Sequence, residues 1–202
     1  MYKRQVLYIN KGEWQFEDFT LAAGVAAPNR YSNGSVFADV DGDRDLDLIV
    51  TALGGPNSVF INDGNGIFVE KKLESKLNNP GSTSSALADV DNDGDLDLYI
   101  TNYKRKAMRD SLPPPAISFD NTLYESPDGK WEVVTPFNRE YEAEVKGDKL
   151  FRFEFGEVDL FYFNDGKGNF NLIDITKENF YSADGGPIAV SYTHLRAHET
   201  SI

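Results

Sequence analysis

Cysteine is absent from the chain, and the only two histidines, His194 and His198, stand within its last nine residues. The absence of cysteine excludes disulfide bonds and cysteine-ligated zinc, although it does not identify a cellular compartment. With histidine confined to one end, the rest of the sequence offers no pairing of a nucleophile with a histidine base. Zinc sites and nucleophile–histidine catalysis therefore lose their usual residues.

Basic residues are also scarce: 20 lysines and arginines face 33 aspartates and glutamates, which gives a net charge of −13. Binding to nucleic acid is not expected, because phosphate contacts need clustered basic side chains. Lys104-Arg105-Lys106 forms the one basic run, and we interpret it as a solvated loop segment. We expect no membrane span, because no run reaches the roughly eighteen apolar residues that a membrane helix requires.

Both ends of the chain resemble a single DNA element read in opposite directions. Tyr2-Lys3-Arg4-Gln5 can be encoded by TAT AAG AGA CAG, and the reverse complement of that stretch encodes Val-Ser-Tyr, which stands at 190–192. The two segments resemble the translated transposase adapter of sequencing libraries, so we interpret residues 1–5 and 190–202 as adapter artefact. A natural basic tail is the alternative. Without these segments the net charge changes from −13 to −15.

Two acidic segments fifty residues apart carry the clearest signal in the sequence. Residues 35–51 read SVFADVDGDRDLDLIVT and residues 85–101 read SALADVDNDGDLDLYIT, with eleven of seventeen positions identical. A fixed spacing of this size is typical of repeat architectures. Each copy holds five aspartates at alternate positions: Asp39, Asp41, Asp43, Asp45 and Asp47, then Asp89, Asp91, Asp93, Asp95 and Asp97.

Alternating aspartates at this density indicate a site for a hard divalent cation. Ca²⁺ takes about six to eight oxygen ligands, whereas carboxylates about 4 Å apart without a cation repel each other by roughly 1–4 kcal/mol per pair. We expect ligation by the side chains at positions one, three, five and nine and by the backbone carbonyl at position seven, Asp45 or Asp95. An EF-hand is not favoured, because its twelfth position is a bidentate glutamate and here is Val50 or Ile100. Acidic hairpin loops without metal are the alternative.

The sixth position distinguishes the two predicted sites. Gly94 can adopt the left-handed backbone that such loops use, whereas Arg44 in the equivalent place costs about 1 kcal/mol of strain. We therefore expect two Ca²⁺ sites, the second tighter than the first. Their dissociation constants should lie in the range of roughly 10⁻⁴–10⁻³ M that is typical of extracellular modules.

The acidic loops stand within a recurring order of strands and turns. Alternating apolar residues enter and leave each loop, and a turn of the type Asn-Asp-Gly follows at 62–66 and again at 164–168. We interpret the segments that begin at Asn10 and at Leu123 as weaker copies of this turn hairpin. Strand, acidic loop, strand, strand, turn and strand is the order of a four-stranded propeller blade. The sequence thus predicts an all-β fold, a partial β-propeller of about two to three antiparallel blades in an open arc.

Residues 103–156 break this order. No acidic loop occurs there, and Pro113-Pro114-Pro115 interrupts any ladder of strand hydrogen bonds. We interpret the segment as an insertion in the second blade, whose outer hairpin resumes near Val158; a degenerate blade is the alternative. The aromatic residues of this segment are interpreted as core: Phe137, Tyr141, Phe151, Phe153 and Phe155.

The loops ADVDGDRDLDLIVT and ADVDNDGDLDLYITN resemble the calcium loops of FG-GAP/VCBS repeats, the blades of integrin-α-type β-propellers. Residues 7–25 resemble the join between blades in bacterial proteins of the ASPIC/UnbV and cartilage acidic protein group. The resemblance covers most of residues 6–189, which we take as the propeller domain. It implies structural Ca²⁺ at the two groups of aspartates.

Two classes of function remain open. The first is a calcium-binding propeller module, not an enzyme, that acts as a scaffold for a protein or carbohydrate ligand in a secreted, periplasmic or cell-surface location. The alternative is a fragment of a carbohydrate-active propeller enzyme such as a polysaccharide lyase. A lyase would need an exposed basic residue or tyrosine beside calcium and sugar, for which the candidates are Lys104, Arg105, Tyr141 and Lys149.

Half a blade, one whole blade and one interrupted blade would not close a ring, which needs about four blades or more. We therefore expect open sheet edges near Val6 and near Ile173, and aggregation of the isolated fragment. The repeat spacing also predicts a further acidic loop within about thirty residues after Ala189 in a longer parent protein.

Overall fold

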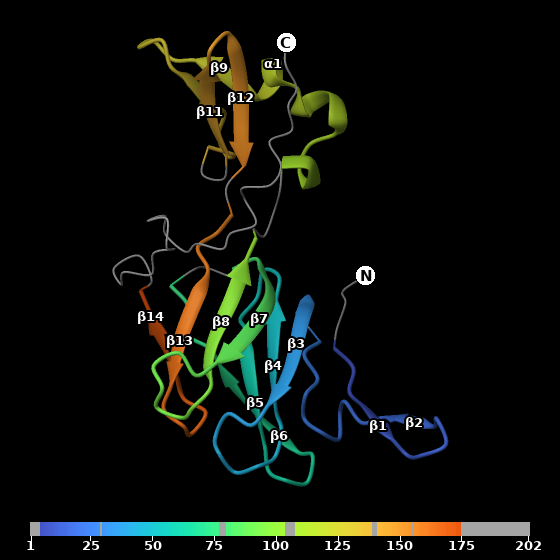
Figure 1. Cartoon of the computed structure of the whole chain (residues 1–202). Helices are drawn as coiled ribbons and strands as arrows, with labels where there is room; N and C mark the ends of the chain where they lie inside the picture. Colours follow the sequence, from blue (N-terminus) through green and yellow to red (C-terminus); the bar gives the residue numbers. More distant parts are fainter. Residues whose placement is uncertain are drawn as a thin grey trace. The chain divides into compact units, whose positions relative to one another are not determined.

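The computed structural model describes residues 5–28, 30–76, 80–103, 108–138, 141–154 and 156–174. Among these, residues up to 103 and from 158 onward form one compact unit, unit 1, and residues 108–157 form a second, unit 2 (Figure 1). Strands and turns make up nearly all of both units, which confirms the predicted all-β class. In the described part of the chain, no helix is long and apolar enough to cross a membrane.

The first sheet of unit 1 has four antiparallel strands in the order β3-β4-β5-β6. These strands are β3 (Ser32–Ala38), β4 (Asp47–Ala52), β5 (Ser58–Asn62) and β6 (Phe68–Lys72). The first acidic loop joins β3 to β4, and the turn of residues 62–66 joins β5 to β6. The order is the one that the repeat predicts for a single blade.

The second sheet of unit 1 also has four antiparallel strands, in the order β14-β13-β8-β7. These strands are β7 (Ser82–Ala88), β8 (Asp97–Asn102), β13 (Leu160–Asn164) and β14 (Phe170–Ile173). β8 pairs directly with β13, with Ile100 opposite Leu160 and Leu98 opposite Tyr162. The chain therefore leaves this sheet after β8 and rejoins it at β13. The segment between them has no strand in the sheet.

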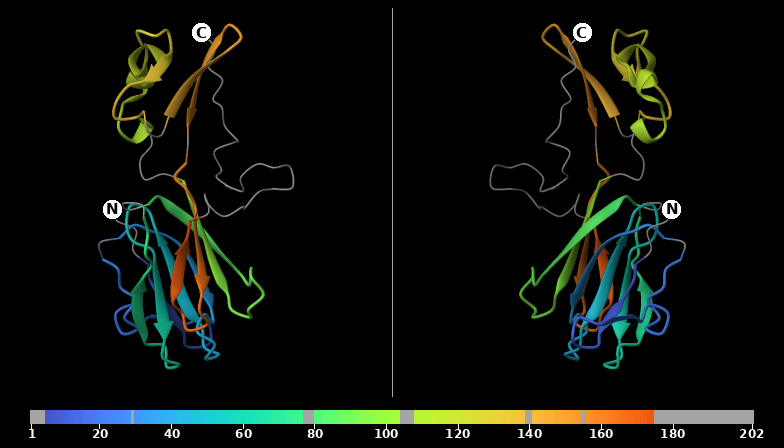
Figure 2. Two further views of the ribbon diagram at one scale, coloured as in Figure 1. Left: turned by 90° about the vertical axis from the view of Figure 1, so that its left-hand side faces the viewer. Right: turned by 90° about the vertical axis from the view of Figure 1, so that its right-hand side faces the viewer.

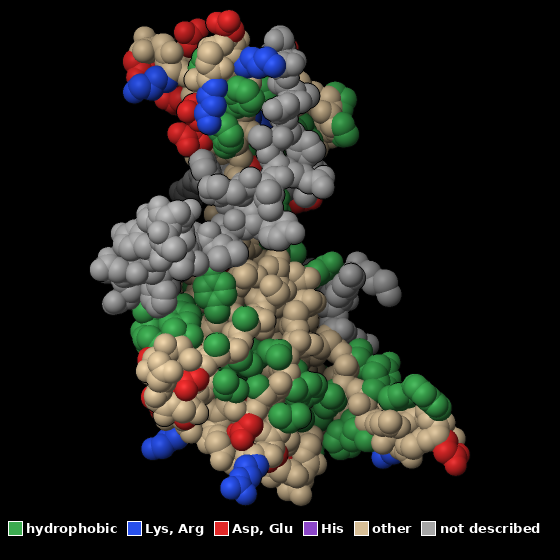
Figure 3. Space-filling view, viewed as in Figure 1, with side chains coloured by type: hydrophobic (Ala, Val, Ile, Leu, Met, Phe, Trp, Pro, Cys, Tyr) green, Lys and Arg blue, Asp and Glu red, His purple; other side chains and the backbone are tan. Residues whose placement is uncertain are grey.

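A shorter hairpin, β1 (Tyr8–Asn10) and β2 (Phe16–Asp18), precedes both sheets. The three hairpins of unit 1 share one register, in which an asparagine opposes a phenylalanine: Asn10–Phe16, Asn62–Phe68 and Asn164–Phe170. β1 and β2 thus correspond to the outer half of a blade. Hydrophobic side chains gather over this hairpin (Figure 3), where Trp14 is 91% and Tyr8 59% exposed. In the described part of the chain, β1 and β14 each pair with one strand only.

The two sheets pack against each other through a hydrophobic cluster. Ile49 and Val59 of the first sheet meet Leu98, Ile100 and Tyr162 of the second, and all five side chains are buried. Both views in Figure 2 place the two sheets side by side. Successive blades in this unit therefore stack through apolar faces.

The opposite face of the first sheet packs against the segment that follows β2. Leu48, Val50 and Phe60 form a buried cluster with Ala23 and Val25. All six residues of β4 are buried, because both faces of the strand are covered. A strand that is covered on both faces has a continuous apolar sequence, which explains the run Leu-Ile-Val at 48–50. Full burial of such a side chain contributes about 1.5–3 kcal/mol.

One residue of the segment interpreted as adapter lies in the described part. The side-chain amide of Gln5 donates a hydrogen bond to the carbonyl of Val25 at 2.6 Å, and its Oε1 accepts one from the hydroxyl of Ser32 at 2.9 Å. Residues 1–4 and 190–202, the remainder of the two segments, lie outside the described residues.

Unit 2 contains two β-hairpins and three short helical turns. Its elements are the 3-10 helices Met108–Asp110 and Pro114–Ile117, the helix α1 (Phe119–Thr122), and the strands β9 (Leu123–Glu125), β10 (Trp131–Val133), β11 (Tyr141–Lys146) and β12 (Lys149–Glu154). β9 pairs with β10 and β11 with β12. The segment from Leu123 is thus a hairpin, but in the described part it joins no four-stranded sheet. It differs in this from the hairpins of unit 1.

The core of unit 2 forms around Met108, Leu123, Val133 and Tyr141. Phe137 packs against this cluster, in agreement with its interpretation as core. The rings of Phe151 and Phe153 stack on each other with centroids 6.1 Å apart. Phe155 lies outside the described residues.

Candidate metal centres

The first acidic loop is closed by Asp47, the first residue of β4. The Asp47 side chain is fully buried. Its Oδ2 accepts a hydrogen bond from the backbone N–H of Val40 at 2.9 Å, and its Oδ1 accepts one from that of Asn62 at 2.8 Å. One oxygen thus holds the start of the loop, and the other holds the turn between β5 and β6. Hydrogen bonds to a charged group of this kind contribute about 1.5–3 kcal/mol each.

Asp97 closes the second loop in the same way. Its side chain is 1% exposed, its Oδ2 accepts from the N–H of Val90 at 2.9 Å, and its Oδ1 accepts from the N–H of Asn164 at 3.1 Å. The aspartate at the ninth position of each loop therefore links the loop to the hairpin turn, and this link does not require a cation.

Between these closing contacts, aspartate side chains fold each loop back on itself. Asp39 accepts hydrogen bonds from the backbone N–H groups of Gly42 at 2.8 Å and Arg44 at 3.0 Å. Asp43 accepts one from the N–H of Asp45 at 3.0 Å. The second loop repeats the pattern with Asp89–Gly94 at 3.2 Å, Asp91–Asp93 at 3.2 Å and Asp93–Asp95 at 2.9 Å. Such side-chain-to-backbone bonds are the usual way in which aspartate stabilises tight loops.

This folding brings carboxylates together in both loops. In the first loop, one oxygen from each of Asp39, Asp41 and Asp43 lies within 4.8 Å of the others. In the second, the same holds for Asp89, Asp91 and Asp97. Oxygens at such separations can share a Ca²⁺ ion, whose ligands lie about 2.3–2.6 Å from the metal. The other predicted ligands, which are Asp45, Asp47, Asp93 and Asp95, stand outside these two groups of three.

Asp45 carries an oxygen without a donor. Among the described residues, its Oδ1 is the one buried side-chain oxygen or nitrogen with no hydrogen-bond partner. Burial raises the pKa of Asp45, and the charges of Asp43 and Asp47 raise it further. The sequence predicts that this position contributes only its backbone carbonyl, whereas the charges of the other aspartates also act on its carboxylate. Asp45 as a whole is half-buried, and only its Oδ1 is covered. A covered oxygen without a donor fits a cation, because buried polar atoms otherwise have a hydrogen-bond partner.

The pKa values of three other aspartates are raised by the same two effects, burial and neighbouring negative charge. Burial raises the pKa of Asp41, and the neighbouring charges of Asp47 and Asp43 add to the effect. The pKa values of Asp91 and Asp95 are raised by burial first and then by nearby aspartates. A divalent cation would relieve this repulsion in each loop, since an opposite charge favours the ionised form.

The backbone at the sixth position is left-handed in both loops, as the sequence predicts. Arg44 has φ = 78° and Gly94 has φ = 97°. At this position, only the first loop places a side chain in a conformation that costs a non-glycine residue about 1–2 kcal/mol. At the fourth position the relation is reversed, with Gly42 at φ = 80° and Asn92 at φ = 62°, although asparagine adopts this conformation more readily than arginine.

Two asparagines complete the sites from outside the loops. The side-chain amide of Asn62 donates to the carbonyl of Leu46 at 3.1 Å, and that of Asn164 donates to the carbonyl of Leu96 at 3.2 Å. Sequence reasoning treats both only as turn formers. The sequence signal is the recurrence of asparagine at the first position of each hairpin turn. Asn62 follows Asn10 by about one repeat, and Asn164 follows Asn62 after the inserted segment.

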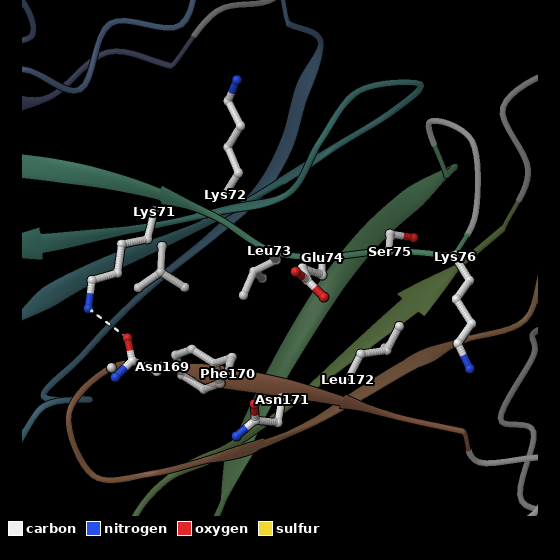
Figure 4. A pocket seen from close by; sticks show the side chains of 12 residues that line it. Lys71, Lys72, Leu73, Glu74, Ser75, Lys76, Asn169, Phe170, Asn171 and Leu172 are labelled. Atoms are coloured by element: carbon white, nitrogen blue, oxygen red, sulfur yellow. Dashed lines mark hydrogen bonds between the residues drawn. The ribbon is translucent and has the colours of Figure 1, made fainter.

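A groove of about 670 Å³ lies between β6 and β14, the outer strands of the two sheets (Figure 4). One wall carries Lys71, Leu73 and Lys76, and the other carries Asn169 and Phe170. The ammonium of Lys71 donates to the side-chain oxygen of Asn169 at 3.3 Å. The groove thus combines ammonium, amide and aromatic groups.

Of the residues considered for lyase chemistry, the structure describes Tyr141 and Lys149, which stand at opposite ends of one hairpin. Tyr141 is 8% exposed, and its hydroxyl accepts a hydrogen bond from the N–H of Met108 and donates one to Glu154 at 2.8 Å. Lys149 stands at the other end of the β11–β12 hairpin, where it opposes Lys146. Lys104 and Arg105 lie outside the described residues.

Residues 39–100 match the family model of the FG-GAP-like repeat. The match begins at the first aspartate of the first loop and ends within β8, so it contains both acidic loops and the first sheet beyond β3. No curated protein matches the chain. The FG-GAP part of the sequence resemblance is confirmed for these residues, and an FG-GAP-like repeat implies a β-propeller-like repeat module.

Proposed function

We propose that each acidic loop binds one Ca²⁺ ion and that the ion is structural. The observation that carries the proposal is the convergence of three carboxylates in each loop. The buried and unpartnered Oδ1 of Asp45 supports it for the first loop. FG-GAP-like repeats commonly bind calcium, which agrees with this donor set.

The residues that would hold the ion are the aspartates at alternate positions of each loop. A bound Ca²⁺ would supply positive charge where carboxylates otherwise repel one another. Asp47 and Asp97 use both oxygens for backbone N–H groups, so they orient the loop and retain lone pairs for a cation. Each loop offers enough carboxylate and carbonyl oxygens to fill the coordination of the ion, which favours a structural role over activation of a water molecule.

We further propose that the module is a non-enzymatic scaffold in a secreted, periplasmic or cell-surface protein, related to the ASPIC/UnbV group. Sites of millimolar affinity fill where free calcium is high, which is the case outside the cytosol. The groove between β6 and β14 offers a place for a protein or carbohydrate ligand. A screen of the chain against polysaccharides tests the enzyme alternative, since a lyase would release unsaturated products and a scaffold would not.

Calorimetry with Ca²⁺ tests the metal assignment. Two sites are expected, and Asp93→Ala should abolish the tighter one. Asp43→Ala, its counterpart in the first loop, should abolish the weaker one. Absence of heat at millimolar Ca²⁺, or two intact sites in the Asp93→Ala variant, would rule the assignment out.

A further inference from the structure

The turn of residues 164–168, between β13 and β14, contacts both acidic loops. Within its own sheet, Asn164 donates its backbone N–H to Asp97 and its side-chain amide to the carbonyl of Leu96. The same side-chain amide donates to the carbonyl of Val40 at 2.8 Å, and the N–H of Gly168 donates to that carbonyl at 3.1 Å. Val40 belongs to the first loop, between the predicted ligands Asp39 and Asp41.

The backbone of this turn also packs closely against the loops. A Cβ added to Gly166 would lie 2.4–2.8 Å from the carboxylate atoms of Asp95. A Cβ added to Gly168 would come closest to the Ile61 side chain, at 2.7 Å, and would be in ordinary contact with the Cβ of Asp41 in the first loop, at 3.6 Å. A side chain at Gly166 would displace the Asp95 carboxylate, and the backbone there, at φ = 68°, also favours glycine. The turn is a shared wall of both loops.

The equivalent turn of the first sheet lacks this second contact. Asn62 binds Asp47 and Leu46 of its own loop, as Asn164 binds Asp97 and Leu96. No hydrogen bond from Asn62 to another acidic loop occurs among the described residues. Asn164 is correspondingly 6% exposed, whereas Asn62 is half-buried. The contact between neighbouring loops therefore belongs to the turn of residues 164–168, with Asn164 as its side-chain donor, and Asn62 is the matched control for that side chain.

We propose that the turn of residues 164–168 couples the two cation sites, so that an ion in the second loop tightens binding in the first. The inference rests on the proposed binding of Ca²⁺. An ion in the second loop fixes Asp97 and the Leu96 carbonyl, and these fix Asn164. The fixed amide of Asn164 then holds Val40, so the first loop loses less conformational freedom when its own ion binds.

Electrostatics works in the opposite direction. An ion in one loop reduces the negative potential at the other and so weakens its attraction for a cation. Salt screens this effect between exposed charges, whereas coupling through hydrogen bonds persists. Measurement at raised ionic strength therefore isolates the contribution of the turn.

The test compares the affinity of the first loop for Ca²⁺ in three full-length backgrounds, which are the unmodified chain, Asn164→Ala and Asn62→Ala, each with and without Asp93→Ala. Disabling the second loop with Asp93→Ala should weaken binding at the first loop by about five-fold or more, the lower end of typical coupling between sites. In a chain with Asn164→Ala, adding Asp93→Ala should leave the affinity of the first loop nearly unchanged. In a chain with Asn62→Ala, adding Asp93→Ala should still weaken it.

Reciprocity provides a second measurement that does not depend on Asn164. Disabling the first loop with Asp43→Ala should weaken the second by the same factor, because coupling between binding equilibria is symmetric. If each loop binds equally well with and without the other, the coupling is absent although both sites exist. If neither loop binds Ca²⁺, the proposed function fails together with the coupling.

Discussion

The carboxylate of Asp47 and the backbone N–H of Asn62 meet at 2.8 Å, which fixes the acidic loop of the first sheet to the turn of its outer hairpin. The same relationship recurs in the second sheet, where Asp97 and Asn164 meet at 3.1 Å across a sequence separation of 67 residues. The contact is therefore a feature of each four-stranded blade, and it forms whether or not a long segment separates the two residues in the sequence.

Replacement of Asp47 by alanine should destabilise unit 1 even without calcium. The substitution leaves the N–H groups of Val40 and Asn62 without acceptors, at a cost of about 1–3 kcal/mol for each buried group. Urea denaturation in the presence of a chelator measures the effect. Asp43→Ala is the control, because that side chain is exposed. Equal stability of the two variants would contradict a structural role for Asp47.

Arg44→Gly should stabilise the first loop and tighten its Ca²⁺ site. The residue stands at φ = 78°, where glycine avoids about 1 kcal/mol of strain, although glycine also gains freedom in the unfolded chain. Calorimetry should show an affinity closer to that of the second loop. The reverse change, Gly94→Arg at φ = 97°, should weaken the second site. Loss of the arginine charge would act in the same direction, because a cationic side chain repels Ca²⁺. Arg44→Ala separates the two effects, since it removes the charge but keeps a side chain at φ = 78°. If Arg44→Ala tightens the site as much as Arg44→Gly does, the charge and not the backbone controls the affinity.

Protonation of Glu70 in acid should lower the stability of unit 1. Burial alone would raise the pKa of Glu70, but hydrogen bonds from the Ser58 hydroxyl, at 2.6 Å, and the Arg30 guanidinium lower it below its usual value. A carboxyl with a lowered folded pKa stabilises the fold above its unfolded pKa, about 4.3, and this contribution is lost as pH falls through the folded pKa.

Thermal unfolding between about pH 3 and pH 6 measures this contribution, since the change in protonation spans the two pKa values. Glu70→Gln should remove part of the pH dependence, and its stability should approach that of the unmodified chain at the acid end. Glu142→Gln, at an exposed position of β11, is the control. A Glu70→Gln curve parallel to that of the unmodified chain would exclude the proposed contribution.

Replacement of residues 104–156 by a short flexible linker should leave unit 1 folded. The two ends of the segment already meet, because the side-chain amide of Asn102 donates to the carbonyl of Val158 at 2.6 Å and the N–H of Asn102 donates to Asp159 at 2.7 Å. Ca²⁺ titration of the shortened chain should give two sites of unchanged affinity. Loss of the second site would show that unit 2 supports it.

The repeat could be predicted from sequence because it depends on local chemistry. Alternating aspartates, an asparagine–glycine turn and apolar strands identify the two acidic loops and the hairpins that follow them. The left-handed backbone at Arg44 and Gly94 follows from the spacing alone. Ca²⁺ binding, location and ligand remain predictions.

The contacts that join neighbouring repeats could not be predicted in this way. The hydrogen bond from Asn164 to Val40 spans 124 residues, and no local pattern marks it. The donor-free oxygen of Asp45 likewise depends on the closed shape of the loop. In unit 2, the residues from Leu123 have the composition of a blade hairpin. Their strands β9 and β10 nevertheless form a separate two-stranded sheet and do not join a four-stranded one.

The interrupted sheet also has a consequence for how the protein folds. The first sheet uses consecutive strands, whereas β13 must reach β8 across a segment longer than fifty residues. Closing such a loop costs about 2 kcal/mol more conformational entropy than closing one of about five residues. During synthesis, Asp47 of the first loop can bind Asn62 early, whereas Asp97 of the second loop can bind Asn164 only after the long segment between them has been made. The two acidic loops, although nearly identical in sequence, therefore complete their closing contacts at different times. If synthesis slows or stalls, the second loop is the one that lacks its contact with Asn164.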